Sequence, residues 1–138
     1  MFELIYCSIA QPEITIDDIN AILKTSREHN YSNAITGCLL YFNHEFIQVL
    51  EGERKVVEQL FSRIEKDKRH SSVILLAAGE KEKRIFDNWS MAFYGINSAA
   101  DIGEYLFKEN ILAFSEFTEQ PTHAVKLFWY MAKQMLQE

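Results

Sequence analysis

Features that this sequence lacks narrow its possible functions before any motif is considered. The chain has 138 residues, only two prolines and no apolar run long enough to span a membrane. Its 14 lysines and arginines face 20 aspartates and glutamates, for a net charge of −6. Because binding to phosphate backbones or anionic lipid depends on clustered basic residues, we expect no direct nucleic-acid contact and no membrane binding. The length suits one compact domain with a small helical appendage.

Signatures of metal sites, nucleophiles and dinucleotide binding are also missing. Cys7 and Cys38 lie within apolar segments without CxxC or Cys/His spacing, which predicts reduced core residues. The four histidines show no ligand spacing, and no Gly-rich dinucleotide fingerprint occurs. No basic segment precedes an apolar run at the N-terminus. The expectation is therefore a cytoplasmic protein without a bound metal.

One carboxamide interrupts a segment that otherwise reads as a buried strand. Gln48 lies in the middle of residues 45–50, where strand alternation gives it an apolar face. An unpaired buried amide costs about 1–3 kcal/mol, so it needs a protein, water or ligand partner. Residues 2–8 repeat this pattern with Tyr6 and Ser8. Two interpretations stay open: a Tyr6–Gln48 hydrogen bond in an ordinary core, or polar groups that converge on one heterocycle.

The spacing of apolar residues predicts an alternating order of strands and helices. Thr15 and Asp18 form a capping box that starts the first helix, flanked by Ile14 and Ile19 as a hydrophobic staple. The expected elements are a strand over 2–8, a helix from 16 to about 29–30, a loop over 30–33, a hairpin of 35–42 with the Gln48 strand, a second helix ending around 67–70, strands over 72–78 and 88–94, and helical patterns near 101–113 and 122–137.

This order predicts an α+β sandwich of the ferredoxin-like type, with a mixed sheet and two helices on one face. The face of Tyr6 and Gln48 is expected to meet those helices. The C-terminal helices would pack on the other face, which would otherwise stand bare. The final helix has an apolar side made of Val125, Phe128, Trp129, Ala132, Met135 and Leu136. Packing on the domain's own sheet is favoured; a subunit or partner interface, suggested by Phe114, Phe117 and Tyr130, is the alternative.

Polar residues near the ends of the first two helices have commonplace explanations when taken singly. His29, Asn30 and Asn33 lie where the first helix ends, a usual place for capping. Arg63 and Asp67 have the i, i+4 spacing of an exposed ion pair, worth less than about 1 kcal/mol. Each residue alone therefore says little about function.

Taken together, the same residues suit a flavin. Its isoalloxazine ring has an apolar plane that needs aliphatic walls, for which Ile22 and Ile64 are candidates. Its polar edge needs amide, hydroxyl and guanidinium partners, which the cleft floored by Tyr6 and Gln48 would supply.

A set of short motifs occurs in order along about two-thirds of the chain. They are Tyr6-Cys-Ser8, His29-Asn30, Thr36-Gly37, Phe46-Ile-Gln48-Val-Leu-Glu-Gly52, Arg63, Asp67-Lys-Arg-His70 and Trp89-Ser-Met91. Each is weak evidence alone, but their order and spacing are highly specific. The sequence resembles the BLUF domain, a sensor of blue light that uses FAD.

The resemblance implies a role for each matching residue. Tyr6 and Gln48 would form the hydrogen-bonded pair at the flavin edge, and Asn30 would hold the carbonyl edge. The remaining cofactor contacts would come from His29, Arg63, Asp67, Arg69 and His70, beside the proposed walls Ile22 and Ile64. Asn30 is preferred to Asn33 as the ligand.

The last strand is implied to carry the signal. Ser8 would lie near Tyr6 and Trp89, and Trp89 or Met91 would occupy the place beside Gln48 in exchange. A core anchor is the alternative role for Trp89.

The resemblance also implies a mechanism without lasting covalent change. Excited flavin would take an electron and then a proton from Tyr6, and Gln48 would end either rotated or as its imidic tautomer. Residues 1–95 would form the light-sensing domain and residues 96–138 a helical extension that serves as cap or output.

No cyclase, phosphodiesterase or DNA-binding signature occurs, so we expect a photoreceptor that is not an enzyme. Its output would pass through an unidentified effector protein or through homo-oligomerisation. Two other functions stay open at this point: a small flavin-dependent oxidoreductase, and a ferredoxin-like oligomerisation module that binds no flavin.

Overall fold

The computed structural model describes residues 1–42, 44–86, 92–95 and 122–136, and every structural statement below concerns these residues. The elements in chain order are β1 (Phe2–Ala10), α1 (Ile16–Ser32), β2 (Thr36–Phe42), β3 (Glu45–Gly52), α2 (Arg54–Glu65), β4 (His70–Glu80), β5 (Ala92–Gly95) and α4 (His123–Leu136).

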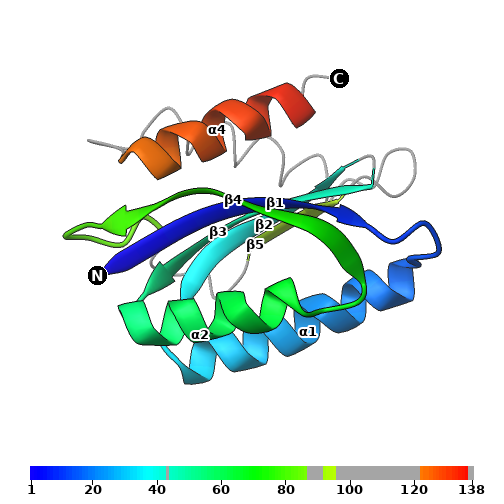
Figure 1. Cartoon of the computed structure of the whole chain (residues 1–138), viewed down its shortest axis with the longest axis horizontal. Coiled ribbons are helices and arrows are strands. Elements are labelled where there is room, and N and C mark those ends of the chain that lie inside the picture. Colours follow the sequence, from blue (N-terminus) through cyan, green and yellow to red (C-terminus); the bar gives the residue numbers. More distant parts are fainter. Residues whose placement is uncertain (43, 87–91, 96–121, 137–138) are drawn as a thin grey trace.

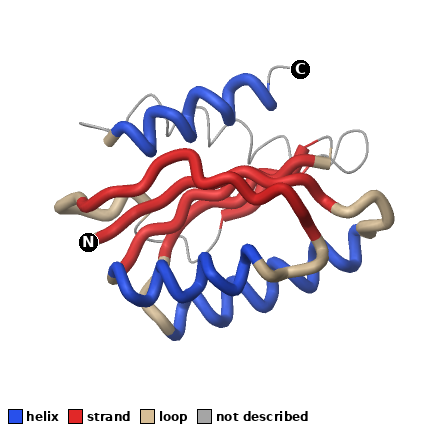
Figure 2. Tube along the Cα trace, in the orientation of Figure 1, coloured by secondary structure: helices blue, strands red, loops and turns tan. Residues whose placement is uncertain are grey.

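A five-stranded sheet forms the middle layer, in the order β4-β1-β3-β2-β5. β1 is antiparallel to both β3 and β4, and β2 is antiparallel to β3. β5 runs parallel to β2, so the sheet is mixed. Helices α1 and α2 cover one face and α4 lies across the other, as Figures 1 and 2 show. The predicted α+β ferredoxin-like sandwich is confirmed.

Two apolar clusters hold the three layers together. On the α1/α2 side, Leu4 and Leu50 of the sheet pack in one cluster with Leu23 and Val57 of the helices. This arrangement confirms that the face of Tyr6 and Gln48 meets these helices. The second cluster joins the other sheet face to α4; it comprises Ile5, Cys38, Leu40, Ile47, Val49, Phe86, Ala124, Val125, Phe128, Trp129 and Ala132.

The described part of α4 packs on the protein's own sheet, as favoured above. Val125, Phe128, Trp129 and Ala132 are buried, whereas Tyr130 is exposed. Both cysteines are free: Cys38 is buried in the α4-side cluster, and Cys7 is half-buried against it.

The first helix starts as predicted but ends later. Thr15 and Asp18 form the capping box, with the Asp18 amide donating to Thr15 Oγ1 at 3.1 Å. The predicted end at residues 29–30, with a loop over 30–33, is wrong because the helix continues through Ser32. Asn33 is the actual C-cap; its Nδ2 donates to the His29 carbonyl at 2.8 Å, and Ala34 then takes a positive φ that reverses the chain.

The second helix ends earlier than predicted, at Glu65 instead of residues 67–70. Asp67 lies beyond it, where its carboxylate accepts the backbone N–H of Arg69 at 2.9 Å in a turn that competes with the helix. The strand predicted over 72–78 is longer, because β4 pairs with nearly the whole of β1, including His70 with Ala10.

Some predictions lie partly or wholly outside the described residues. Of the strand predicted over 88–94, Ala92–Tyr94 fall within β5, and residues 88–91 are outside the description. The helical pattern near 101–113, Trp89, Met91, Phe114 and Phe117 are also outside it. Within the described part of the chain, no helix is long and apolar enough to cross a membrane.

Candidate cofactor pocket

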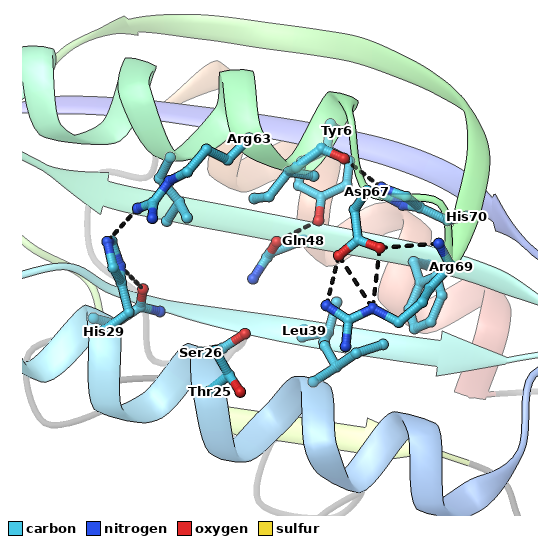
Figure 3. Close-up of a pocket in the computed structure, with 15 residues that line it drawn as sticks. Tyr6, Thr25, Ser26, His29, Leu39, Gln48, Arg63, Asp67, Arg69 and His70 are labelled. Carbon is cyan, nitrogen blue, oxygen red and sulfur yellow. Dashed lines mark hydrogen bonds and ion pairs between the residues drawn. The ribbon is translucent and has the colours of Figure 1, made fainter.

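A cavity of about 250 Å³ lies between α1, α2 and the sheet. It is lined by Tyr6, Ile22, Thr25, Ser26, His29, Asn30, Leu39, Phe46, Gln48, Leu60, Arg63, Ile64, Asp67, Arg69 and His70. Figure 3 shows these side chains around one space. The volume is below the range of about 300–1,000 Å³ typical of pockets that enclose a whole ligand. The cavity therefore suits one fused-ring part of a larger molecule.

The floor of the pocket carries a hydrogen-bonded pair. Tyr6 and Gln48 are directly opposite each other on the antiparallel strands β1 and β3. The Tyr6 hydroxyl donates to Gln48 Oε1, and both residues are 4% exposed. Burial raises the pKa of the Tyr6 phenol, and the negative charge of Asp67 raises it further. The phenol is therefore held protonated, as its role of donor requires.

His70 joins the pocket floor to the end of α2. Its Nε2 lies 2.6 Å from the Ile64 carbonyl, which can only accept, so Nε2 carries a proton. Its Nδ1 lies 2.7 Å from Ser8 Oγ. In the neutral ring, Nδ1 then accepts from the Ser8 hydroxyl. Ser8 and Tyr6 share one face of β1, so His70 fixes the strand beside the phenol.

A second histidine orders the opposite end of the pocket. The guanidinium of Arg63 donates to Nε2 of His29, which places the histidine proton on Nδ1. That nitrogen lies 3.5 Å from Oδ1 of Asn30, a long contact. Asn30 is only 1% exposed, whereas Arg63 is exposed. This end of the pocket therefore runs from a buried amide to an exposed cation.

Asp67 binds Arg69 and not Arg63, so the ion pair considered from i, i+4 spacing is wrong. Arg69 Nη2 donates to Asp67 Oδ2 at 2.6 Å, and its Nε donates to Oδ1 at 3.0 Å. The hydrogen bond from Arg69 lowers the pKa of the Asp67 carboxyl. Because Asp67 lies beyond the last turn of α2, helical spacing does not apply to it.

The structure brings the predicted contact residues together. All ten predicted cofactor contacts line the cavity: Tyr6, Ile22, His29, Asn30, Gln48, Arg63, Ile64, Asp67, Arg69 and His70. Ser8 lies behind His70 and is absent from the lining, whereas Asn33 is the exposed helix cap. Trp89 and Met91 lie outside the described residues.

Sequence reasoning missed five lining residues: Thr25, Ser26, Leu39, Phe46 and Leu60. Periodicity could have found them. Ser26 is one turn from both Ile22 and Asn30, and Leu39 pairs directly with Gln48 in the hairpin.

The residues present fit a flavin ring. Buried Tyr6, Asn30 and Gln48 supply donors and acceptors for a heterocycle edge, and half-buried Ile22 and Ile64 supply aliphatic walls. Exposed Arg63 and Arg69 at the solvent side suit the anionic remainder of a dinucleotide. Within the described residues, no group of three or more His, Cys, Asp or Glu side chains could hold a metal ion.

The fold and the pocket together define an α+β domain with a site for a planar ring, and comparisons with known proteins identify its family. A family model described as "Sensors of blue-light using FAD" matches residues 1–92. The chain belongs to this family, BLUF, and is a blue-light sensor that binds FAD.

Much larger proteins are among those similar to this chain. The beta subunit of photoactivated adenylate cyclase from Euglena gracilis is 34% identical over 89 residues, 64% of this chain and 10% of that protein. Thus the chain spans about a tenth of such curated relatives.

Solved structures also resemble the chain. BlsA in its photo-activated state is 30% identical, with a TM-score of 0.69 and coverage of 99% of this chain and 95% of that one. Klebsiella pneumoniae BlrP1 with FMN and cyclic diGMP is 29% identical, with a TM-score of 0.76 and coverage of 96% and 34%.

Proposed function

We propose that this protein signals blue light through the Tyr6–Gln48 pair. The observation that carries the proposal is the hydrogen bond from the Tyr6 hydroxyl to Gln48 Oε1 at the floor of a ring-sized cavity. Bound FAD would supply absorption of blue light and a ring that accepts an electron. Everything else in the mechanism rests on the residues around that ring.

Tyr6 is the proposed electron and proton donor. Its raised pKa keeps the proton on the phenol in the dark, so a proton is available at the hydroxyl. The hydrogen bond to Gln48 gives that proton a defined direction. Burial excludes the water that would otherwise exchange with it.

Gln48 is the proposed two-state element. An amide has one donor end and one acceptor end, so exchanging them reverses every hydrogen bond that it makes. In the present arrangement Oε1 accepts from Tyr6. After rotation the amide nitrogen would face the phenol oxygen, which would become the acceptor. The imidic tautomer would change the same bonds without rotation.

The remaining pocket residues would bind and orient the cofactor. We assign Asn30 to the carbonyl edge of the ring and Arg63, Asp67 and Arg69 to contacts at its more open side. His29 would set the position of the Arg63 guanidinium, which donates to it. His70 would hold Ser8 and the start of β4 in place.

The light signal would leave this protein through contacts with other protein surfaces and not through a catalysed reaction. We propose that residues 1–95 sense light and that residues 96–138 act as a cap or output segment. Signalling would then reach a separate effector protein or proceed by self-association, and no catalytic role is proposed. Relatives named as photoactivated adenylate cyclases support an effector partner as the general arrangement.

Absorption spectroscopy with a Gln48→Leu variant tests the proposal. The purified protein should show a flavin spectrum that shifts slightly to the red after a blue flash and recovers in darkness. Gln48→Leu should retain flavin and lose the shift, because leucine cannot exchange donor and acceptor. Gln59→Leu, which changes an exposed glutamine of α2, is the matched control and should shift normally. A normal shift in Gln48→Leu would refute the role of Gln48.

A further inference from the structure

A second cluster of buried charges lies on the α4 side of the sheet, away from the pocket. Glu3 and Glu51 are directly opposite each other on β1 and β3 and are 2% and 0% exposed. Lys81 Nζ lies 3.0 Å from Glu3 Oε1 and also pairs with Glu51. Because like charges directly opposite on a sheet repel, the buried ammonium is what allows the two carboxylates to lie together. We call these three residues the charge latch.

The charge latch holds the segment that follows β4. The Glu51 carboxylate accepts backbone N–H groups from Ile85 at 3.0 Å and from Phe86 at 2.6 Å. It also accepts the Thr36 hydroxyl at 2.8 Å. Arg84 adds a bond to the Thr36 oxygen at 2.9 Å. Lys81, Arg84, Ile85 and Phe86 therefore tie this segment to the ends of β2 and β3 through polar contacts that are buried or partly buried.

The same cluster reaches the start of α4. Thr122 Oγ1 donates to Glu3 Oε1 at 2.9 Å and accepts the Val125 amide at 3.3 Å, as an N-cap does. Phe86, held by Glu51, is 1% exposed and lies against two aromatic rings of α4. The ring centroids are 6.0 Å from Phe128 and 5.7 Å from Trp129. Both members of the carboxylate pair thus contact elements that determine where α4 lies.

Strand β3 connects this cluster to the pocket. Gln48 points to the pocket side, whereas Glu51, three residues later, points to the α4 side. A shift of β3 at Gln48 would therefore move the carboxylate that holds Ile85 and Phe86. The distance along the chain is short, and all four residues from Gln48 to Glu51 are buried.

We propose that the charge latch is the positioning device that keeps α4 on the sheet, and that Glu51 passes changes at Gln48 to α4 through residues 85 and 86. The light-dependent part rests on the proposed function of Gln48. The docking of α4 in darkness does not rest on that function. An experiment can therefore refute the docking role and the light-dependent role separately.

Hydrogen exchange of α4 amides in darkness tests the docking role. Lys81→Met keeps most of the unbranched side chain but removes the ammonium group, and leaves two opposed buried carboxylates. We expect α4 amides to exchange roughly tenfold faster or more, while flavin binding and the red shift persist. Arg54→Met removes exposed ion pairs with Glu58 and Glu80 and should leave α4 exchange unchanged. Unchanged exchange in Lys81→Met, or equal loss of protection in α1, would overturn the proposal.

A milder variant keeps the test valid if Lys81→Met does not fold. Thr122→Val removes only the hydroxyl that links Glu3 to the α4 N-cap, and it should also speed α4 exchange. Where Lys81→Met folds, it can be combined with Thr122→Val. If both residues act through Glu3, the α4 exchange rate of this double variant should increase by less than the product of the two single increases. Strictly multiplicative effects would show independent contacts and refute the latch as one unit.

Illumination separates this inference from the proposed function. In the unsubstituted protein, blue light should change both the flavin absorbance and α4 exchange. In Lys81→Met, which removes the cation beside Glu51, the absorbance shift should remain while the light-minus-dark difference in α4 exchange shrinks. If illumination produces the red shift but no change in α4 exchange, only the light-dependent role of Glu51 is refuted. Absence of the red shift itself would contradict the proposed function and leave the dark result standing.

Discussion

Tyr6 and Gln48 lie directly opposite each other in the β1/β3 register, and their side chains share the hydrogen bond at the pocket floor. The contact is thus set by backbone pairing and does not depend on a flexible loop. Neighbouring pairs such as Leu4 with Leu50 bury both partners, so a register slip would expose them. The sheet register therefore places Tyr6 and Gln48 opposite each other.

Asn30→Ala should weaken retention of FAD. Asn30 is buried at the pocket wall and is proposed to bind the ring's carbonyl edge. Loss of one such hydrogen bond corresponds to about 0.5–1.5 kcal/mol, or about 2- to 13-fold in Kd. Titration of the apoprotein with FAD, followed by fluorescence, measures the effect. Asn20→Ala changes an exposed asparagine of the same helix and should bind as the unsubstituted protein does. Equal affinities in the two variants would show that Asn30 has another role.

The raised pKa of Tyr6 predicts a loss of stability in alkali. Above about pH 10 an unfolded tyrosine releases its proton while the buried phenol keeps it. The stability that Tyr6 contributes through its raised pKa is fully present below the pKa of an unfolded tyrosine. It is lost as the pH rises toward the pKa of Tyr6 in the folded protein. The free energy of unfolding should fall by up to about 1.4 kcal/mol per pH unit more steeply in the unsubstituted protein than in Tyr6→Phe. Urea denaturation at about pH 9, 10 and 11 measures both slopes.

A control distinguishes burial from tyrosine content in that experiment. Tyr31 is 82% exposed on α1, so Tyr31→Phe should show the slope of the unsubstituted protein. Parallel slopes for Tyr6→Phe and Tyr31→Phe would contradict the raised pKa.

Gly37→Ala should strongly destabilise the fold. A Cβ at this position of β2 would lie 2.0 Å from the Val49 carbonyl oxygen, so the β2/β3 pairing would have to shift. Overpacking of this kind typically costs about 1–3 kcal/mol or more. Gly79→Ala on β4 is the matched control, since a Cβ there meets no atom within 4 Å. Chemical denaturation of both variants should give a large loss for Gly37→Ala and a change within about 0.5 kcal/mol for Gly79→Ala. Similar denaturation midpoints for the two variants would be inconsistent with the close approach of Gly37 to the Val49 carbonyl oxygen.

Phe128→Ala should remove much of the packing between α4 and the sheet. Phe128 is fully buried in the α4-side cluster, so truncation should cost about 3–5 kcal/mol. Tyr130→Ala removes an exposed ring of the same helix, 64% exposed, and should have little effect. Thermal unfolding of the two proteins provides the comparison, and matching losses would mean that α4 does not pack through Phe128.

Local patterns allowed much of the fold to be predicted. The Thr15/Asp18 capping box and the apolar period of α1 are encoded within a few residues, and both appear as expected. The prediction of the hairpin was also correct. Phe42 pairs with Glu45 across the turn, and His44 takes the positive φ that such a turn requires. Alternation in β1 and β3 was sufficient to place Tyr6 and Gln48 on one face.

Contacts between distant segments could not be predicted in the same way. The partner of Asp67 depends on where α2 stops, and sequence reasoning extended that helix past Glu65. Glu3 and Lys81 are joined only after β4 has returned along β1, so no spacing rule relates them. The family resemblance supplied the roles of Arg69 and His70, which local chemistry alone did not suggest.

The helix α4 has a practical consequence for anyone who wishes to isolate the sensor. The family match stops at residue 92, yet the apolar core continues into residues 124–132. A fragment cut at that match would present Ile5, Leu40 and Val49 to water along one whole side of the sheet. Such a fragment should aggregate when expressed, whereas one that retains α4 should not. The apolar core is thus longer in sequence than the segment that the family model matches.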